Sequence, residues 1–115
     1  MDSTPRFLQG TFPFTGKGLN EPYPLSGDLR YTVPDGVVAQ TVYLRGGNST
    51  GELICLVLMR DAVPMRLFPL GARSSVHVSL RVIEDLPPGS IIEVFVAAPE
   101  GLSGLAVVDL GLVEV

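Results

Sequence analysis

The sequence predicts an all-β domain, an antiparallel β-sandwich of about seven strands. Residues 75–82 alternate between polar and apolar side chains, which is typical of a strand with one buried face. The chain also combines 46% hydrophobic residues with 13 glycines and 10 prolines, and this composition suits many short strands joined by tight turns. No stretch repeats apolar residues at helical spacing behind a capping residue. A small closed β-barrel is the alternative architecture.

Length, charge and cysteine usage narrow the class of protein. A chain of 115 residues forms one domain and buries a core without disulfide or metal staples. The net charge is −4 and no basic cluster with interleaved aromatics occurs, so we expect no nucleic-acid partner. No apolar run has the length of a membrane span, so we expect no membrane partner. The first ten residues lack the apolar centre of a signal peptide and Cys55 is a lone cysteine, which together favour a cytoplasmic location.

Residues 1–28 are expected to form an extended N-terminal arm that precedes a β-sandwich domain at 29–115. The arm has no clean hydrophobic period, although a short edge strand fits residues 8–14. Because aromatic side chains gain free energy by leaving water, we expect those of the arm to pack on this domain's core or on a neighbouring subunit. These side chains are Phe7, Phe12, Phe14 and Tyr23.

The first half of the sandwich domain contains two predicted strands and a loop. Alternation predicts a short strand at 29–33 and a longer one at 37–45, separated by the turn tripeptide Pro34-Asp35-Gly36. Residues 46–51 (GGNSTG) are nearly all turn formers and predict a loop, which lacks the lysine and following helix of a phosphate cradle. Within it, Asn48-Ser49-Thr50 matches a glycosylation acceptor, a match that has meaning only in a secreted chain.

The second half begins with the most apolar stretch of the chain. The nearly continuous apolar run at 52–60 predicts a strand buried on both faces. Residues 63–70 contain two prolines, which favour an edge strand or an irregular return. The remaining predicted strands cover residues 75–82, 91–98 and 105–115.

A local motif resembles one corner of fibronectin type III domains. The stretch Leu86-Pro87-Pro88-Gly89-Ser90, the alternation at Val94, Val96 and Ala98, and the turn at 101–104 are similar to the E–F corner, F strand and F–G loop of that family. The resemblance covers about a quarter of the chain, and the family's corner tyrosine, placed near Ile92, and its tryptophan are absent. It implies an immunoglobulin-like sandwich, and domains of this kind usually bind or space other proteins.

Candidate catalytic residues are few. His77 is the single histidine, and a Ser–His–Asp arrangement would require Asp61, Asp85 or Asp109 beside it. No G-x-S-x-G elbow presents a nucleophile, so we expect an exposed or interface histidine and no enzymatic activity. Cys55 lies among apolar neighbours, where burial raises a thiol pKa and makes the thiol inert.

No cofactor or metal is expected. One histidine cannot complete a copper site with Cys55 and the methionines, and no Cys-x-x-Cys spacing supports zinc. Glu84 and Asp85 are adjacent before a proline corner, which favours a solvated turn over a pair of catalytic carboxylates. Calcium between loops has no spaced ligand motif behind it.

The function predicted from the sequence is a non-catalytic protein-interaction or assembly module, a self-associating or accessory subunit that is also consistent with a virion-associated protein. The charges are segregated along the chain. All charged residues at 82–115 are acidic, whereas arginines outnumber acidic residues at 51–81. We expect a homo-oligomer or a protein partner. The candidate interaction residues are Phe7, Phe12, Phe14, Tyr23, Arg66, Arg73 and His77.

Two alternatives belong to other classes. In the first, a small-ligand-binding β-barrel encloses an apolar cavity, with Gln40, Tyr43 or Arg45 orienting the ligand. The second, which the sequence favours least, is a small hydrolytic enzyme that uses His77, Ser79 or Cys55.

Overall fold

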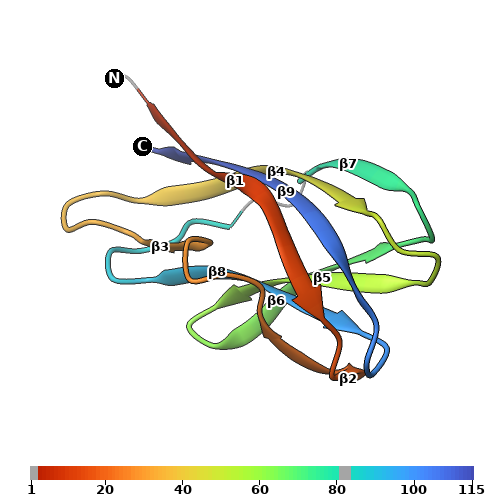
Figure 1. Cartoon of the computed structure of the whole chain (residues 1–115). Coiled ribbons are helices and arrows are strands. Elements are labelled where there is room, and N and C mark those ends of the chain that lie inside the picture. Colours follow the sequence, from red (N-terminus) through yellow and green to blue (C-terminus); the bar gives the residue numbers. More distant parts are fainter. Residues whose placement is uncertain (1–2, 81–83) are drawn as a thin grey trace.

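The protein is a sandwich of two antiparallel sheets in a computed structural model that describes residues 3–80 and 84–115 (Figure 1). Sheet A has the order β1-β9-β4-β7, and sheet B has the order β2-β8-β5-β6 with β3 also paired to β8. The strands are β1 (Thr4–Thr15), β2 (Gly18–Pro24), β3 (Arg30–Thr32), β4 (Ala39–Asn48), β5 (Ile54–Arg60), β6 (Val63–Leu70), β7 (Ser75–Ser79), β8 (Ile91–Ala98) and β9 (Ser103–Glu114). The predicted all-β sandwich is confirmed, and the barrel is excluded because both sheets have open edges.

Strand pairing is nested along the chain. β1 pairs with β9, β2 with β8, β4 with β7, and β5 with β6. The chain is therefore one long hairpin that closes at the β5–β6 turn and folds over into two layers, which is the topology of a jelly roll. In this order β8 and β9 lie in different sheets, whereas the last two strands of an immunoglobulin-like sandwich share one. The fibronectin resemblance thus extends to the sandwich architecture, but the strand order differs.

The N-terminal segment contributes two strands to the sandwich, which raises the number of described strands from the predicted seven to nine. β1 pairs with β9 without interruption from Thr4, opposite Glu114, to Thr15, opposite Ser103. Thr4 at the start of β1 and Glu114 at the end of β9 therefore lie side by side at one end of sheet A (Figure 1).

A buried carboxylate fixes this end of the sandwich. The Glu114 carboxylate accepts a hydrogen bond from the hydroxyl of Tyr31 on β3. It also forms an ion pair with the Nε atom of Arg6 on β1 at 3.1 Å. The hydrogen bond from Arg6, followed by the one from Tyr31, lowers the pKa of the Glu114 carboxyl. Burial is the main cause that raises the pKa of Tyr31. The cluster joins both sheets, because β3 belongs to sheet B and the other two strands to sheet A.

Two glycines predicted to lie in a loop are part of a strand. β4 runs through Gly46 and Gly47 to Asn48, so the loop predicted at 46–51 begins three residues later. A Cβ atom at Gly46 would lie 2.9 Å from Leu56 Cδ1 in the core, so a side chain there would displace the Leu56 side chain. The sequence pattern was misleading because glycine is a turn former and also the residue that permits close packing.

β5 is apolar on both sides, as predicted. Ile54, Leu56 and Leu58 are fully buried between the sheets, and Val57 and Met59 are buried on the outer face of sheet B. β6 is an edge strand, which confirms one of the two forms predicted for residues 63–70. None of the described residues forms a helix long and apolar enough to cross a membrane.

Candidate interaction site

The edges of the two sheets differ in how they are protected. β1 and β7 are the edges of sheet A, whereas β6 forms one edge of sheet B and β2 with β3 forms the other. Prolines on an edge strand block pairing with another chain because they donate no hydrogen bond. β1, β2 and β6 each contain two prolines, respectively Pro5 and Pro13, Pro22 and Pro24, and Pro64 and Pro69. β7 has the sequence SVHVS, which contains neither a proline nor a Lys, Arg, Asp or Glu.

The backbone of β7 points hydrogen-bonding groups away from the sheet. Leu80 donates its N–H to Val42, and Ser74 accepts one from Asn48, so the even-numbered residues of this segment bond to β4. Because the pattern alternates in an antiparallel pair, the N–H and C=O groups of Ser75, His77 and Ser79 point outward. The turn and loop hydrogen bonds of the described residues do not involve these groups.

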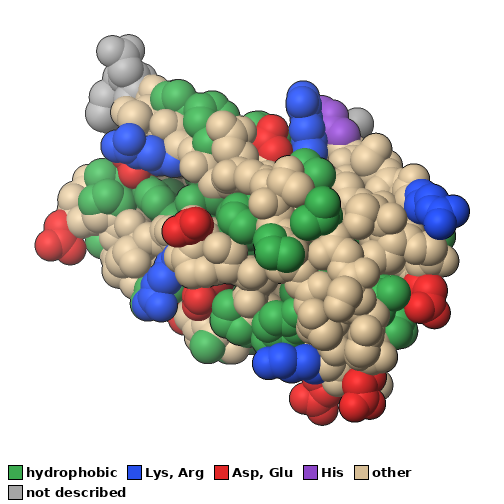
Figure 2. All heavy atoms as spheres, in the orientation of Figure 1, with side chains coloured by type: hydrophobic (Ala, Val, Ile, Leu, Met, Phe, Trp, Pro, Cys, Tyr) green, Lys and Arg blue, Asp and Glu red, His purple; other side chains and the backbone are tan. Residues whose placement is uncertain are grey.

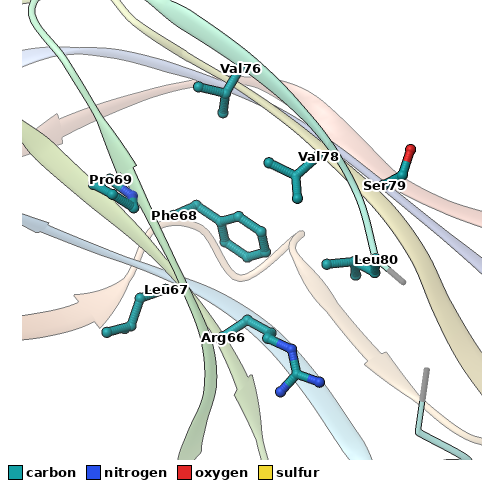
Figure 3. A pocket seen from close by; sticks show the side chains of 8 residues that line it. All are labelled: Arg66, Leu67, Phe68, Pro69, Val76, Val78, Ser79 and Leu80. Atoms are coloured by element: carbon teal, nitrogen blue, oxygen red, sulfur yellow. The ribbon is translucent and has the colours of Figure 1, made fainter. Parts of the chain in front are cut away.

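An apolar groove lies between β7 and β6, at the open side of the sandwich. Its volume is about 410 Å³. Figure 3 shows Val78 of β7 and Leu80, which follows this strand, directed toward the ring of Phe68 on β6, whereas Ser79 and Leu67 point away from the centre. The groove is lined by Arg66, Leu67, Phe68, Pro69, Val76, Val78, Ser79 and Leu80. The open edge and the groove therefore occupy the same side of the molecule.

Charged residues gather beside the groove. Glu84 contacts Arg60 Nη1 at 3.4 Å and Arg66 Nη2 at 3.2 Å, and Arg66 also donates from Nη1 to the Met65 carbonyl at 2.8 Å. The neighbouring Asp85 accepts a hydrogen bond from Gln40 Nε2 at 2.7 Å. Two arginines of the basic segment thus meet an acid of the acidic segment within the same molecule.

The outer face of sheet A next to β7 carries an aromatic cluster. The Tyr43 ring covers Gly111, where a Cβ atom would lie 2.1 Å from Tyr43 Cε2, and its hydroxyl donates to Asp109 Oδ1 at 2.9 Å. The His77 ring meets the Tyr43 ring edge-on, with centroids 5.8 Å apart, and the Arg45 guanidinium lies 5.7 Å from the centroid of Tyr43. Burial is the main cause that raises the pKa of Tyr43. Figure 2 shows the histidine exposed at the surface beside a basic side chain.

A shallow hollow adjoins this cluster where Gly47 places no side chain on the outer face of sheet A. Its volume is about 590 Å³. It is lined by Arg45, Gly46, Gly47, Ser75, Val76, His77 and Val107.

The structure does not bring Asp109 to His77 as a Ser–His–Asp arrangement would require. In the register of sheet A, Arg45 on β4 lies between His77 and Asp109, so the strands of these two residues are separated by about 10 Å. Cys55 lies half-buried on β5, where burial raises the pKa of its thiol. Among the described residues, no three His, Cys, Asp or Glu side chains are grouped to hold a metal ion.

The predicted interaction residues do not form one site. Phe14 is buried in the core and Phe12 is packed against it, whereas Phe7 is 53% exposed on β1. Tyr23 is half-buried, and its hydroxyl donates to the Thr15 carbonyl at 2.6 Å. Arg66 and His77 lie on the β6 and β7 side of the molecule, and Arg73 lies in the turn before β7 with a φ of 49°.

The sequence analysis missed the role of Asn48. Its amide nitrogen donates to the carbonyls of Glu52, Leu70 and Gly71 at 2.8, 3.3 and 3.0 Å, and its oxygen accepts hydrogen bonds from Thr50. Because this side chain is 5% exposed and fully bonded, it is not presented for glycosylation in the folded protein. The sequence signal for this role is the alternation of the preceding strand. If it is continued through Gly46 and Gly47, it places Asn48 on the buried face.

The fold and this site define a small jelly-roll sandwich with one edge strand, β7, that carries neither proline nor a charged residue. No protein-family model and no curated protein matches the sequence. The structure is similar to the CBM36-1 domain, a carbohydrate-binding domain, of a multidomain xylanase from the hindgut metagenome of Trinervitermes trinervoides. The TM-score is 0.58 and the identity 14%, over 96% of each chain.

A second solved structure with this fold is that of the T=1 particles derived from Infectious Bursal Virus. It has a TM-score of 0.53 and 8% identity, and the match covers 97% of this chain and 31% of the viral one. At these identities the two similarities establish the β-sandwich fold, whereas function depends on the site.

Proposed function

We propose that this chain is a non-catalytic assembly module that binds a protein partner along the β7 edge. The observation that carries the proposal is the contrast among the edges, since β1, β2 and β6 carry prolines and β7 carries neither proline nor a formal charge. An exposed edge of this kind binds an extended segment by adding it to the sheet. The main-chain bonds would supply affinity, and the adjoining groove would accept alternate apolar side chains of the partner.

The similar structures support this class of function at a general level. One is a carbohydrate-binding domain and the other forms a virus-derived particle, so both have roles in binding or assembly. Assembly within a virion is a finer form of the same proposal, as is the role of spacing or binding proteins implied by the fibronectin resemblance. A homo-oligomer or a hetero-partner in the cytoplasm fits either form.

The test is to add a strand to the edge. A synthetic peptide of alternating threonine and valine is titrated into the ¹⁵N-labelled protein, and we expect chemical-shift changes centred on the amides of Ser75, His77 and Ser79. His77→Pro removes the central outward N–H and should abolish these changes. Gln9→Pro, at a residue paired with Asp109 on the opposite edge of sheet A, is the matched control and should leave them intact. Absence of shift changes at β7 with millimolar peptide would contradict the proposal.

Small-ligand binding is the second candidate, and it is favoured by the hollow beside the Tyr43 and His77 rings. Aromatic rings beside polar side chains suit a saccharide, and the similar domain belongs to a xylanase. Calorimetric titration with soluble xylo-oligosaccharides should give saturable heat that Tyr43→Ala removes. A titration without heat would dismiss this candidate, and the enclosed-barrel version is already excluded by the open sheets.

A further inference from the structure

We propose that the partner at β7 is a second copy of this chain, and that two β7 strands pair antiparallel about a twofold axis at His77. The proposal deepens the proposed function and rests on it. The pairing would join the two four-stranded A sheets into one continuous sheet across the dimer. A twofold arrangement uses the same surface on both copies, so it closes after two molecules.

The sequence of β7 is the same read in either direction. SVHVS is centred on His77, so an antiparallel pair about that residue places Ser75 opposite the partner's Ser79, Val76 opposite the partner's Val78, and the two His77 residues opposite each other. The backbone groups that point outward belong to the odd-numbered residues, and these would exchange two hydrogen bonds in each of three pairs. Valine pairs of this kind stabilise a sheet on the side that faces the grooves.

Charge distinguishes β7 from the other edges. In a twofold pairing each charged residue near the axis approaches its own copy, and like charges opposite each other are destabilising. β1 contains Arg6, β2 contains Glu21 and β6 contains Arg66, whereas β7 has no formally charged residue. The two His77 side chains meet at the axis, each with Arg45 and Tyr43 of its own chain beside it on β4.

The length of β7 limits the area of the dimer contact and therefore its affinity. Five residues span about 17 Å, and the two shorter dimensions of the molecule are 23 and 22 Å. The contact is then roughly 370 Å² on each copy, or about 740 Å² in total, which is below the total of about 1,200 Å² at which stable interfaces begin. The dimer is consequently weak and concentration-dependent, with the apolar grooves of both copies covered on association.

The experiment is sedimentation of the full chain between about 10 µM and about 1 mM, where a weak dimer forms progressively. We expect His77→Lys and His77→Glu each to weaken association about tenfold or more, because like charges then meet at the axis. Mixing the two variants should restore association, because Lys and Glu then face each other. This rescue requires residue 77 of one copy to lie against residue 77 of the other.

Gln9→Lys and Gln9→Glu, at an exposed residue on the opposite edge of the same sheet, are the matched controls and should leave the mass unchanged. A wild-type monomer up to about 1 mM, or a dimer that both His77 variants leave intact, would overturn the second-copy proposal. If the threonine–valine peptide still shifts the β7 amides in either case, the proposed function survives with a different partner. If the peptide also fails, both proposals fall.

Discussion

The two edge strands of sheet A, β1 and β7, differ in how their unpaired backbone groups are protected from pairing with another chain. β1 is 12 residues long, pairs with β9 along its whole length, and carries Pro5 and Pro13. β7 has 5 residues, no proline, and a groove beside it. Prolines protect an edge that must not pair, so we call β1 the sealed edge and β7 the open edge. The difference supports the proposal that β7 accepts an additional strand.

The largest expected effect is on the free energy of unfolding and concerns the packing of β1 against the core. Phe14→Ala empties a core position on β1 and should lower the free energy of unfolding by about 3–5 kcal/mol. Phe7→Ala, at an exposed residue of the same strand, is the control and should change stability by about 0.5 kcal/mol or less. Urea unfolding measures both. Equal, small effects would mean that β1 is an independent arm and that the comparison with β7 is wrong.

A second prediction concerns the support of β7. Asn48→Ala removes the buried amide that donates to the carbonyls of Glu52, Leu70 and Gly71, and should cost about 2–3 kcal/mol. Asn48→Asp should cost at least as much because it turns an oxygen toward those carbonyls. Thermal unfolding is the measurement, with the exposed Asn20→Ala as control. A harmless Asn48→Ala would show that the turn holds β7 without this side chain.

The sequence predicts β7 better than it predicts β1. The alternation around His77 predicted β7, since its outward residues are polar and its inward ones apolar. The full extent of β1 was hidden because its prolines occupy edge-facing positions, which read locally as irregular chain, and because its partner β9 lies at the far end of the sequence. Local patterns also cannot reveal nesting, so the corner at 86–90 suggested immunoglobulin-like connectivity. The palindromic sequence SVHVS of β7 can be seen in the sequence, but only the strand order of sheet A shows that β7 is an edge strand.

Acid should loosen the sealed edge before the open one. Because the pKa of Glu114 is lowered in the folded protein, its contribution is complete above the unfolded value of about 4.3 and is lost as pH falls through the folded value. We expect amide exchange in β1 to accelerate below about pH 4 relative to exchange in β7. Glu114→Gln should remove this pH dependence, whereas Glu100→Gln in an exposed turn should not. Uniform acceleration in both strands would contradict the assignment.

The smallest expected effect lies beside the open edge. Tyr43→Phe removes the hydrogen bond to Asp109 but keeps the ring over Gly111, so stability should fall by about 0.5–1.5 kcal/mol. Association measured by sedimentation should not change, because the hydroxyl takes no part in strand pairing. A large loss of association in this variant would move the interface from the edge of sheet A to its outer face.

Nested pairing also has a consequence for the newly made chain. Thr15 and Ser103 are neighbours in the sheet, yet 88 positions separate them, so β1 emerges from the ribosome roughly 4 to 18 s before its partner. During that interval the backbone groups of β1 that later bond to β9 are unpaired, and its prolines reduce the number of N–H donors open to other chains. The six prolines distributed over β1, β2 and β6 therefore protect the unfinished protein as well as the finished one.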